Sequence, residues 1–278
     1  MSNHNRKSNG SRNKLIAGIS AVVIAALAIF LGFQFMSPTA SSSNGVKSVL
    51  TSKKANTYKV SDEEKAYLKN KFDGLEATNP DTIAYVYAPG TKLDEPVVQT
   101  TDNSTYLDKT FDGGNVPYLG TVFMDTDNKK DFSDRLTWLF GHARGSKVAD
   151  SRMFNDVNYY SDQSFFDNHK YVVIETPQRK YYYEALAMVI VPEDTAFYRT
   201  SFKDDKDFQE QLDIIYNTAD VKNKDLKVSA SDKYLVLSTC REEDETIRAN
   251  LYLRQIPDSE MSDFVAKHGK DLEYTPTR

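Results

Sequence analysis

The chain of 278 residues contains one cysteine, Cys240, which ends the apolar run YLVLSTC and precedes an acidic cluster. A thiolate is a strong nucleophile, but a thiol with an ordinary pKa of about 8.5 is only slightly ionised at neutral pH. Such a cysteine therefore needs a base or a cationic neighbour to attack a substrate. An inert, buried cysteine is the simplest alternative.

His142 is the histidine best placed to assist a thiol. It follows the apolar run Leu136 to Phe140, so that, like Cys240, it is expected at the end of a strand. The other three histidines are interpreted as solvated residues in a tail or at helix ends: His4, His169 and His268. Taken alone, His142 also fits a structural role.

Arg248 is the expected cationic partner. Acyl transfer needs a donor where negative charge develops on the substrate oxygen. Arg248 opens the next apolar run, IRANLYLR, so the short loop REEDETI returns it beside Cys240. Arg254 lies on the same face of that strand but roughly 20 Å away, and we prefer Arg248. The acidic residues of the loop, Glu242 to Glu245, oppose thiolate formation unless the cationic partners outweigh them.

Metal binding is not indicated. One cysteine and scattered histidines do not suit a closed zinc site. The stretch DTDNKKD, residues 125–131, resembles the start of a calcium loop, but Lys130 and Leu136 stand where glycine and glutamate are needed. We interpret the stretch as a solvated turn.

A helix is expected to open the folded part of the chain. Ser61 is a candidate N-cap with Glu64 in the capping-box position. Apolar residues follow at helical spacing as far as Phe72, with Gly74 beyond them.

Short runs rich in Val, Ile, Tyr and Thr dominate the remainder, and they predict a mainly β fold that closes, or nearly closes, into a barrel. The eight runs are TIAYVYAP, EPVVQT, YLGTVFMD, RLTWLFGHA, KYVVIETP, KYYYEALAMVIV, YLVLSTC and IRANLYLRQI. Two helical insertions are expected at 151–169 and 203–220, and a short tail helix runs from Asp258 to Gly269.

The N-terminal part predicts a membrane anchor. Leu15 to Met36 carries no charge and is long enough to cross a bilayer core of roughly 30 Å. Only basic charges precede it, so the N-terminus is expected in the cytoplasm and the rest of the chain outside. A cleaved signal peptide is the alternative, although its apolar region is normally shorter. We therefore divide the chain into a tail (1–14), an anchor (15–36), a linker (37–60) and an extracellular domain (61–278).

Overall charge and topology narrow the function further. With 35 basic and 40 acidic residues the chain shows no basic stripe, so nucleic-acid binding is not expected. An odd cysteine outside the cell indicates either an intermolecular bridge or a reactive thiol.

These motifs resemble the class B sortases, membrane-anchored cysteine transpeptidases of Gram-positive bacteria. VLSTC at 236–240, with Ser238 and Thr239 before the cysteine, is similar to the family's T-L-x-T-C, with Val236 in place of the usual threonine. FGHAR contains His142 and TIRANLYL contains Arg248. Segments 79–113, 120–125 and 152–176 also resemble the class, so that the likeness covers about 61–256. It implies an eight-stranded barrel with an N-terminal helix and a long helix between strands six and seven.

The resemblance also implies roles. Cys240 would attack the threonine carbonyl of a C-terminal sorting motif in a secreted surface or pilin protein and form a thioester. His142 would protonate the leaving amine and later deprotonate the incoming one. Arg248 and the backbone N–H of Arg241 would stabilise the oxyanion, and Glu242 would orient the histidine. A peptidoglycan cross-bridge or a pilin lysine would be the amine acceptor, and no cofactor would be required.

Two other functions remain open: a thiol protease that hydrolyses its acyl-enzyme, and a non-catalytic, membrane-tethered binding domain. Class B enzymes include anchors of haem-uptake proteins, with motifs like Asn-Pro-Gln-Thr-Asn, and pilin polymerases. The sequence does not separate these substrates. We expect the recognition pocket between residues 177–220 and the strand of Arg248.

Overall fold

The computed structural model describes residues 58–143, 152–195, 197–241, 244 and 246–277, all within one compact unit, Lys53–Arg278. The expected tail, the expected anchor at Leu15 to Met36 and most of the linker lie outside the described residues. In the described part of the chain, no helix has the length and apolar character that crossing a bilayer requires.

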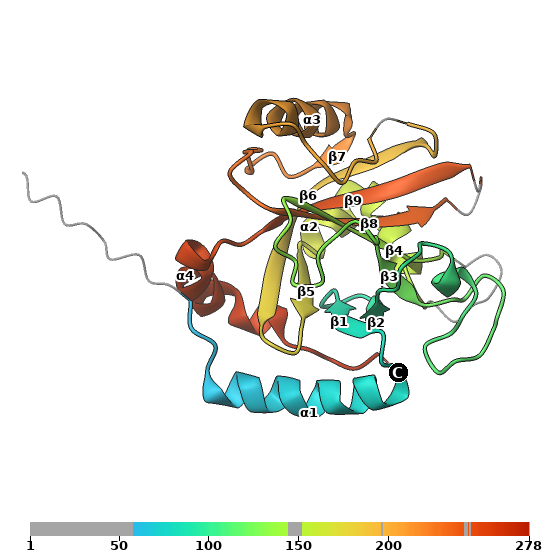
Figure 1. Cartoon of the computed structure of the whole chain (residues 1–278). Coiled ribbons are helices and arrows are strands. Elements are labelled where there is room, and N and C mark those ends of the chain that lie inside the picture. Colours follow the sequence, from blue (N-terminus) through green and yellow to red (C-terminus); the bar gives the residue numbers. More distant parts are fainter. Residues whose placement is uncertain (1–57, 144–151, 196, 242–243, 245, 278) are drawn as a thin grey trace, which may run out of the picture. The chain divides into compact units, whose positions relative to one another are not determined.

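A β-barrel forms the body of this unit (Figure 1). The described residues form a nine-stranded sheet in the order β5-β1-β2-β3-β4-β8-β9-β6-β7, and β5 also pairs with β6. All strands except β7 therefore close into a barrel, and the eight predicted strands are confirmed. Their bounds are β1 (Thr82–Tyr87), β2 (Asp94–Val98), β3 (Val122–Met124), β4 (Leu136–Phe140), β5 (Tyr171–Glu175), β6 (Lys180–Pro192), β8 (Tyr234–Cys240) and β9 (Ile247–Gln255). The two-residue β7 (Val221–Lys222), which pairs with β6, was not predicted.

Two apolar layers explain why the central strands are buried on both faces. Leu235 and Leu237 of β8 belong to the cluster that fills the barrel. Val236, between them, points the other way and packs in a second cluster with Phe208 and Leu212 of α3 (Asp205–Thr218). Figure 1 shows α3 lying across the upper side of the barrel, between β6 and β7 in the chain. The long helix predicted at 203–220 is thus confirmed.

Helix α1 (Asp62–Thr78) lies below the barrel in Figure 1. Ser61 is its N-cap, and the serine side chain accepts a hydrogen bond from the backbone N–H of Glu64, as predicted. The helix does not end near Gly74 but runs through it to Thr78. A glycine inside a helix costs only about 1 kcal/mol relative to alanine, which the buried side chains of Leu68 and Phe72 offset.

A buried carboxylate fastens α1 to the barrel and makes a testable contribution to stability. Glu175 of β5 is fully buried and contacts Lys71 of α1 at 2.7 Å and Lys180 at 2.8 Å. Glu175→Gln would leave two partly buried ammonium groups without a counter-charge. We expect it to lower the free energy of unfolding, measured by denaturant titration, by about 3–5 kcal/mol.

The matched control is Asp73→Asn, which breaks the exposed pair between Lys69 and Asp73 on the same helix. Exposed pairs contribute less than about 1 kcal/mol, so this change is expected to be small. Equal losses in the two variants would contradict the assignment of Glu175 as the main link between α1 and the barrel.

The smaller elements comprise the predicted insertion and tail helix and two short turns that were not predicted. The insertion at 151–169 forms two short helical turns, η2 (Asn155–Ser161) and α2 (Gln163–Asn168), and another turn, η1 (Thr105–Leu107), precedes β3. The tail helix α4 (Asp258–His268) has Gly269 as its C-cap and continues into η3 (Gly269–Leu272). His169 is the C-cap of α2 and His268 ends α4, so the predicted helix-end positions of both are confirmed.

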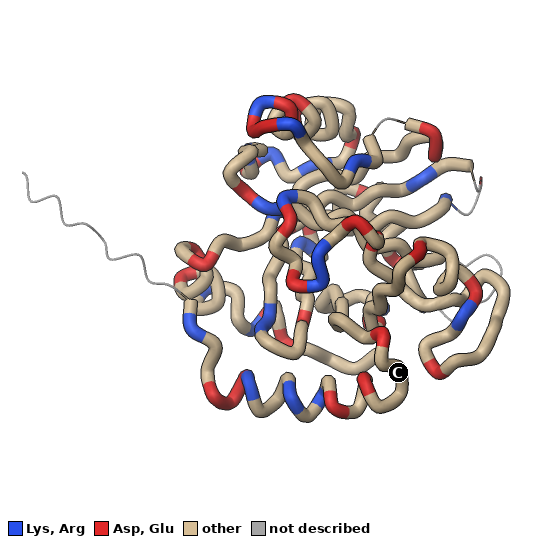
Figure 2. The backbone as a smooth tube through the Cα atoms, in the orientation of Figure 1, with Lys and Arg blue, Asp and Glu red and all other residues tan. Residues whose placement is uncertain are grey.

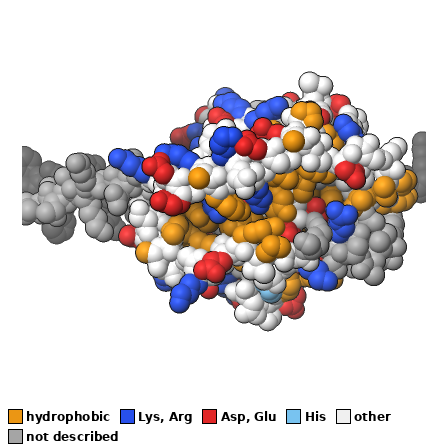
Figure 3. Space-filling model, turned by 90° about the horizontal axis from the view of Figure 1, so that it is seen from below, with side chains coloured by type: hydrophobic (Ala, Val, Ile, Leu, Met, Phe, Trp, Pro, Cys, Tyr) orange, Lys and Arg blue, Asp and Glu red, His pale blue; other side chains and the backbone are white. Residues whose placement is uncertain are grey.

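Charges of both signs are interspersed over the described backbone (Figure 2). Seen from below, hydrophobic side chains gather across the middle of the surface, with charged side chains around them (Figure 3). Apolar atoms make up much of any protein surface, so this area by itself assigns no function.

Candidate active site

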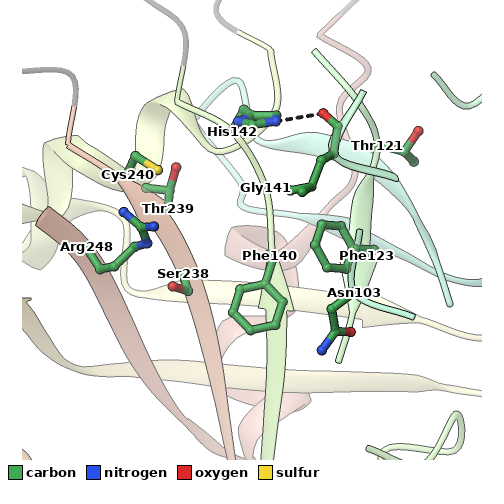
Figure 4. Close-up of a pocket in the computed structure, with 11 residues that line it drawn as sticks. Asn103, Thr121, Phe123, Phe140, Gly141, His142, Ser238, Thr239, Cys240 and Arg248 are labelled. Atoms are coloured by element: carbon green, nitrogen blue, oxygen red, sulfur yellow. Dashed lines mark hydrogen bonds between the residues drawn. The ribbon is translucent and has the colours of Figure 1, made fainter. Parts of the chain in front are cut away.

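The strand register brings the three predicted catalytic residues to one edge of the barrel. β4 and β8 are parallel, with Phe140 opposite Ser238. His142 lies two residues after Phe140, and Cys240 lies two residues after Ser238. β8 and β9 are antiparallel, and Cys240 pairs directly with Arg248. Figure 4 accordingly shows Cys240 and Arg248 side by side at the ends of β8 and β9, with His142 across the pocket.

A pocket of about 260 Å³ opens between these residues. Its lining consists of Asn103, Leu107, Thr121, Phe123, Phe140, Gly141, His142, Ser238, Thr239, Cys240 and Arg248. Cys240 is half-buried. The pocket combines an apolar wall with a thiol, an imidazole and a guanidinium, which is the set of groups that acyl transfer through a cysteine needs.

Three contacts place His142. The backbone N–H of Gly141 donates to Ser238 at 3.2 Å, and the carbonyl of His142 accepts from Phe154 at 2.9 Å. The ring Nε2 lies 2.8 Å from the carbonyl oxygen of Leu107 (Figure 4). Because a carbonyl oxygen can only accept, Nε2 carries a proton in this arrangement. Nδ1 is therefore the nitrogen left to exchange protons with a substrate.

Gly120 allows the backbone to pass close to the Leu107 carbonyl. Gly120 has φ +58°, and a Cβ there would lie 2.3 Å from the Tyr106 carbonyl oxygen and 2.5 Å from that of Leu107. Only glycine fits this position without moving η1.

Gly120→Ala is expected to displace the Leu107 carbonyl and with it the ring of His142. A misplacement of about 1 Å in a catalytic group can cost on the order of a hundredfold in rate, and we expect a loss of that size in kcat for peptide cleavage. Gly113→Ala is the matched control, because Gly113 also has a positive φ, +89°, but a Cβ there meets nothing within 4 Å. If the two variants lost kcat equally, backbone strain alone would explain the effect.

Arg248 forms an ion pair with Glu193, which follows β6. A guanidinium carries five N–H donors in a planar fork, so it can contact a carboxylate and a second acceptor together. Arg254 lies at the other end of the β8–β9 ladder, opposite Tyr234, and pairs with Asp232 and Glu260. The structure thus brings Arg248, and not Arg254, to Cys240.

The residues before Cys240 belong to β8, which is paired with β9. Ser238 and Thr239 are buried, and the carbonyl of Cys240 accepts from the Asn158 side chain of η2 at 3.2 Å. The backbone N–H of Arg241, expected at the oxyanion, donates to Ile247 at 2.9 Å. In this conformation that N–H is engaged in the pairing of β8 with β9. Glu242, the expected orienting residue, lies outside the described residues.

A second pocket, of about 200 Å³, adjoins the first through Phe140, Ser238 and Arg248. It lies between the segment after β6 and the strand of Arg248, where the recognition pocket was expected. Trp138, Tyr198 and Asn250 line it, and the Asn250 amide oxygen is buried without a hydrogen-bond partner among the described residues.

The turn at 125–131 differs from its interpretation as a solvated turn. Asp125 is fully buried and Asn128 nearly so. The turn is built around them because the Asn128 side chain donates to the carbonyl of Leu136 at 3.0 Å and accepts from the backbone N–H of Trp138 at 2.8 Å. Within the described residues, no group of three or more His, Cys, Asp or Glu side chains is arranged to hold a metal ion.

Comparison with known proteins identifies similar chains. Sortase B of Staphylococcus aureus is 30% identical over 176 residues, which are 63% of this chain and 70% of that protein. The structure of the Staphylococcus aureus sortase B-substrate complex matches with a TM-score of 0.62 and 28% identity, over 68% of this chain and 86% of the other. A structure of sortase B complexed with triglycine matches with a TM-score of 0.61 and 28% identity, over 68% and 87%. No protein-family model matches the chain.

Proposed function

The chain belongs to the class B sortases, which are cysteine transpeptidases, and from this premise we propose that it cleaves a C-terminal sorting motif through a thioester at Cys240. The released carboxyl-terminal fragment leaves as an amine, and a second amine takes the protein from the enzyme. The observation that carries the proposal is the register that pairs Cys240 with Arg248 and sets His142 at the same edge.

The first half-reaction forms the thioester. Nδ1 of His142 takes the proton of the Cys240 thiol, and the sulfur attacks the threonine carbonyl carbon. Negative charge moves to the carbonyl oxygen, where the Arg248 guanidinium stabilises it. The carbon–nitrogen bond then breaks, and the leaving amine takes a proton from Nδ1 of His142. The hydrogen bond from Nε2 to Leu107 keeps the ring oriented during this transfer.

The second half-reaction reverses these roles. His142 at Nδ1 accepts a proton from the incoming amine, which attacks the thioester carbon. The new amide bond forms as the carbon–sulfur bond breaks, and Cys240 leaves as a thiolate. No atom outside the substrates and these side chains is consumed.

We propose that the sorting motif occupies the two adjoining pockets, with its threonine at Cys240. The apolar wall of the second pocket suits an apolar side chain of the peptide. The related sortase B structures described as a substrate complex and a triglycine complex support a peptide substrate and an amine acceptor. For this chain the donors are secreted surface or pilin proteins, and the acceptor is a peptidoglycan cross-bridge or a pilin lysine.

We also propose that Leu15 to Met36 anchors the chain in the membrane, with the catalytic domain outside the cell. Support comes from the uncharged length of that segment and the basic residues before it. Protease added to intact cells is expected to digest the catalytic domain, and its full protection would contradict this topology.

The test of function uses the purified full-length chain and a peptide containing Asn-Pro-Gln-Thr-Asn. With triglycine present, chromatography is expected to show a product joined after the threonine to triglycine. Release of the C-terminal fragment with only a free carboxylate as the partner product, at every triglycine concentration, would indicate a thiol protease instead.

Arg248→Lys is expected to lower kcat/KM by on the order of 10²–10³, because lysine keeps the charge but loses the planar fork. Arg254→Lys is the control, since Arg254 lies at the far end of β9 in its own ion pairs. Steady-state kinetics on both variants measure the effect. Wild-type activity in Arg248→Lys, or a loss confined to Arg254→Lys, would move the oxyanion role away from Arg248.

A further inference from the structure

Asp125 is a buried acid that the proposed chemistry does not use. It follows β3 and has no exposed surface. Its Oδ1 accepts from the backbone N–H of Asp127 at 2.8 Å, and its Oδ2 accepts from Asn103 Nδ2 at 3.0 Å and from the Tyr198 hydroxyl. Burying a carboxylate is costly unless donors replace water, and these three donors do so.

The two side-chain donors come from different walls of the proposed peptide groove. Asn103 lines the pocket that contains Cys240, and Figure 4 shows it on the side away from the thiol. Tyr198, in the connection between β6 and α3, lines the second pocket. The two pockets share Phe140 and therefore adjoin. The Asp125 carboxylate thus contacts one lining residue of each pocket.

Further contacts of the same turn hold each wall. The Asn103 Oδ1 accepts from the backbone N–H of Thr126 at 3.0 Å. On the other wall, the Thr200 hydroxyl donates to Asp127 at 3.2 Å. The Tyr198 ring meets Trp138 edge-on with centroids 5.2 Å apart. Packing against Trp138 keeps the Tyr198 ring in place, and the hydrogen bond to Asp125 fixes its orientation.

We propose that Asp125 is a positioning residue that preorganises the substrate groove by holding Asn103 and Tyr198 in a single arrangement. This inference rests on the proposed function, because it takes the two pockets to be the peptide groove. A preorganised groove loses less conformational freedom when a peptide binds. Asn103 lies on the side of its pocket away from the thiol, and neither Asp125 nor Tyr198 lines that pocket, so we expect the link to act on peptide binding more than on the chemistry of Cys240.

Tyr198→Phe is the most informative variant, since it keeps the ring and removes only the hydroxyl. Loss of a hydrogen bond to a buried carboxylate is expected to raise KM for the peptide by about tenfold. We expect kcat and the rate of Cys240 alkylation by iodoacetamide to stay near the wild-type values. Asp125→Asn is expected to raise KM as well, and the double variant is expected to show less than the product of the two effects, because both act through one contact.

The matched control is Tyr85→Phe, which removes a 2.7 Å hydrogen bond from a tyrosine to another buried acid, Asp94. Neither residue lines either pocket. This control variant is expected to lower the melting temperature much as Tyr198→Phe does, with KM unchanged. An unchanged KM in Tyr198→Phe, or an equal rise in Tyr85→Phe, would overturn this inference while the proposed function stands. Absence of peptide turnover by the wild-type chain would overturn both.

Discussion

Cys240→Ala is expected to abolish both peptide cleavage and amine transfer, leaving only the uncatalysed background. The thioester requires a sulfur nucleophile, and this is the one cysteine in the chain. No other thiol can replace it. Steady-state turnover of the motif peptide and labelling with a maleimide are the measurements, and both signals should disappear together.

The fold should survive this change. Cys240 is half-buried at the end of β8, and alanine keeps the backbone pairing with Arg248. An unchanged thermal transition in Cys240→Ala would show that lost activity reflects chemistry and not unfolding. Peptide turnover at the wild-type rate by this variant would contradict the role of Cys240 as the nucleophile and would favour an inert cysteine.

His142→Ala is expected to slow both half-reactions by roughly 10²–10⁴, the usual contribution of a positioned general acid or base. In the proposed mechanism the imidazole serves the leaving amine first and the incoming amine second, so burst and steady-state phases should both fall. Stopped-flow measurement of thioester formation and of its consumption by triglycine separates the two steps.

His169→Ala is the control for this variant. His169 stacks on Phe165 at the end of α2, with ring centroids 4.0 Å apart, and it does not line the pocket of Cys240. Activity near wild type is expected there. Loss of only one half-reaction in His142→Ala would show that another group carries the second proton transfer.

The strand content was predictable because each strand has its own local signal. Runs such as TIAYVYAP and YLVLSTC carry the Val, Ile and Tyr content of strands between turn residues, and all eight strands of the barrel were found. β7 was missed because Val221–Lys222 is too short to show any periodicity. Gly74 was taken for a helix end because local signals do not report that packing of Leu68 and Phe72 sustains α1 beyond it.

The positions of the candidate site residues were also predictable, since Cys240, His142 and Arg248 each stand at or next to the end or beginning of a strand. That they meet depends on a parallel pairing of β4 with β8, which is a contact between distant parts of the chain. The contact of His142 with the Leu107 carbonyl left no signal, because a backbone group is the same in every residue. The burial of Asp125 was missed for a similar reason, as its donors lie far along the chain at Asn103 and Tyr198.

Intact-mass spectrometry of the full-length chain mixed with the motif peptide tests the central claim most directly. We predict an adduct on Cys240 with the mass of the peptide up to its threonine, which disappears when triglycine is added as the ligated product appears. Cleavage of the peptide with no adduct on Cys240, or an adduct that triglycine does not consume while free acid accumulates, would contradict transpeptidation through this thiol.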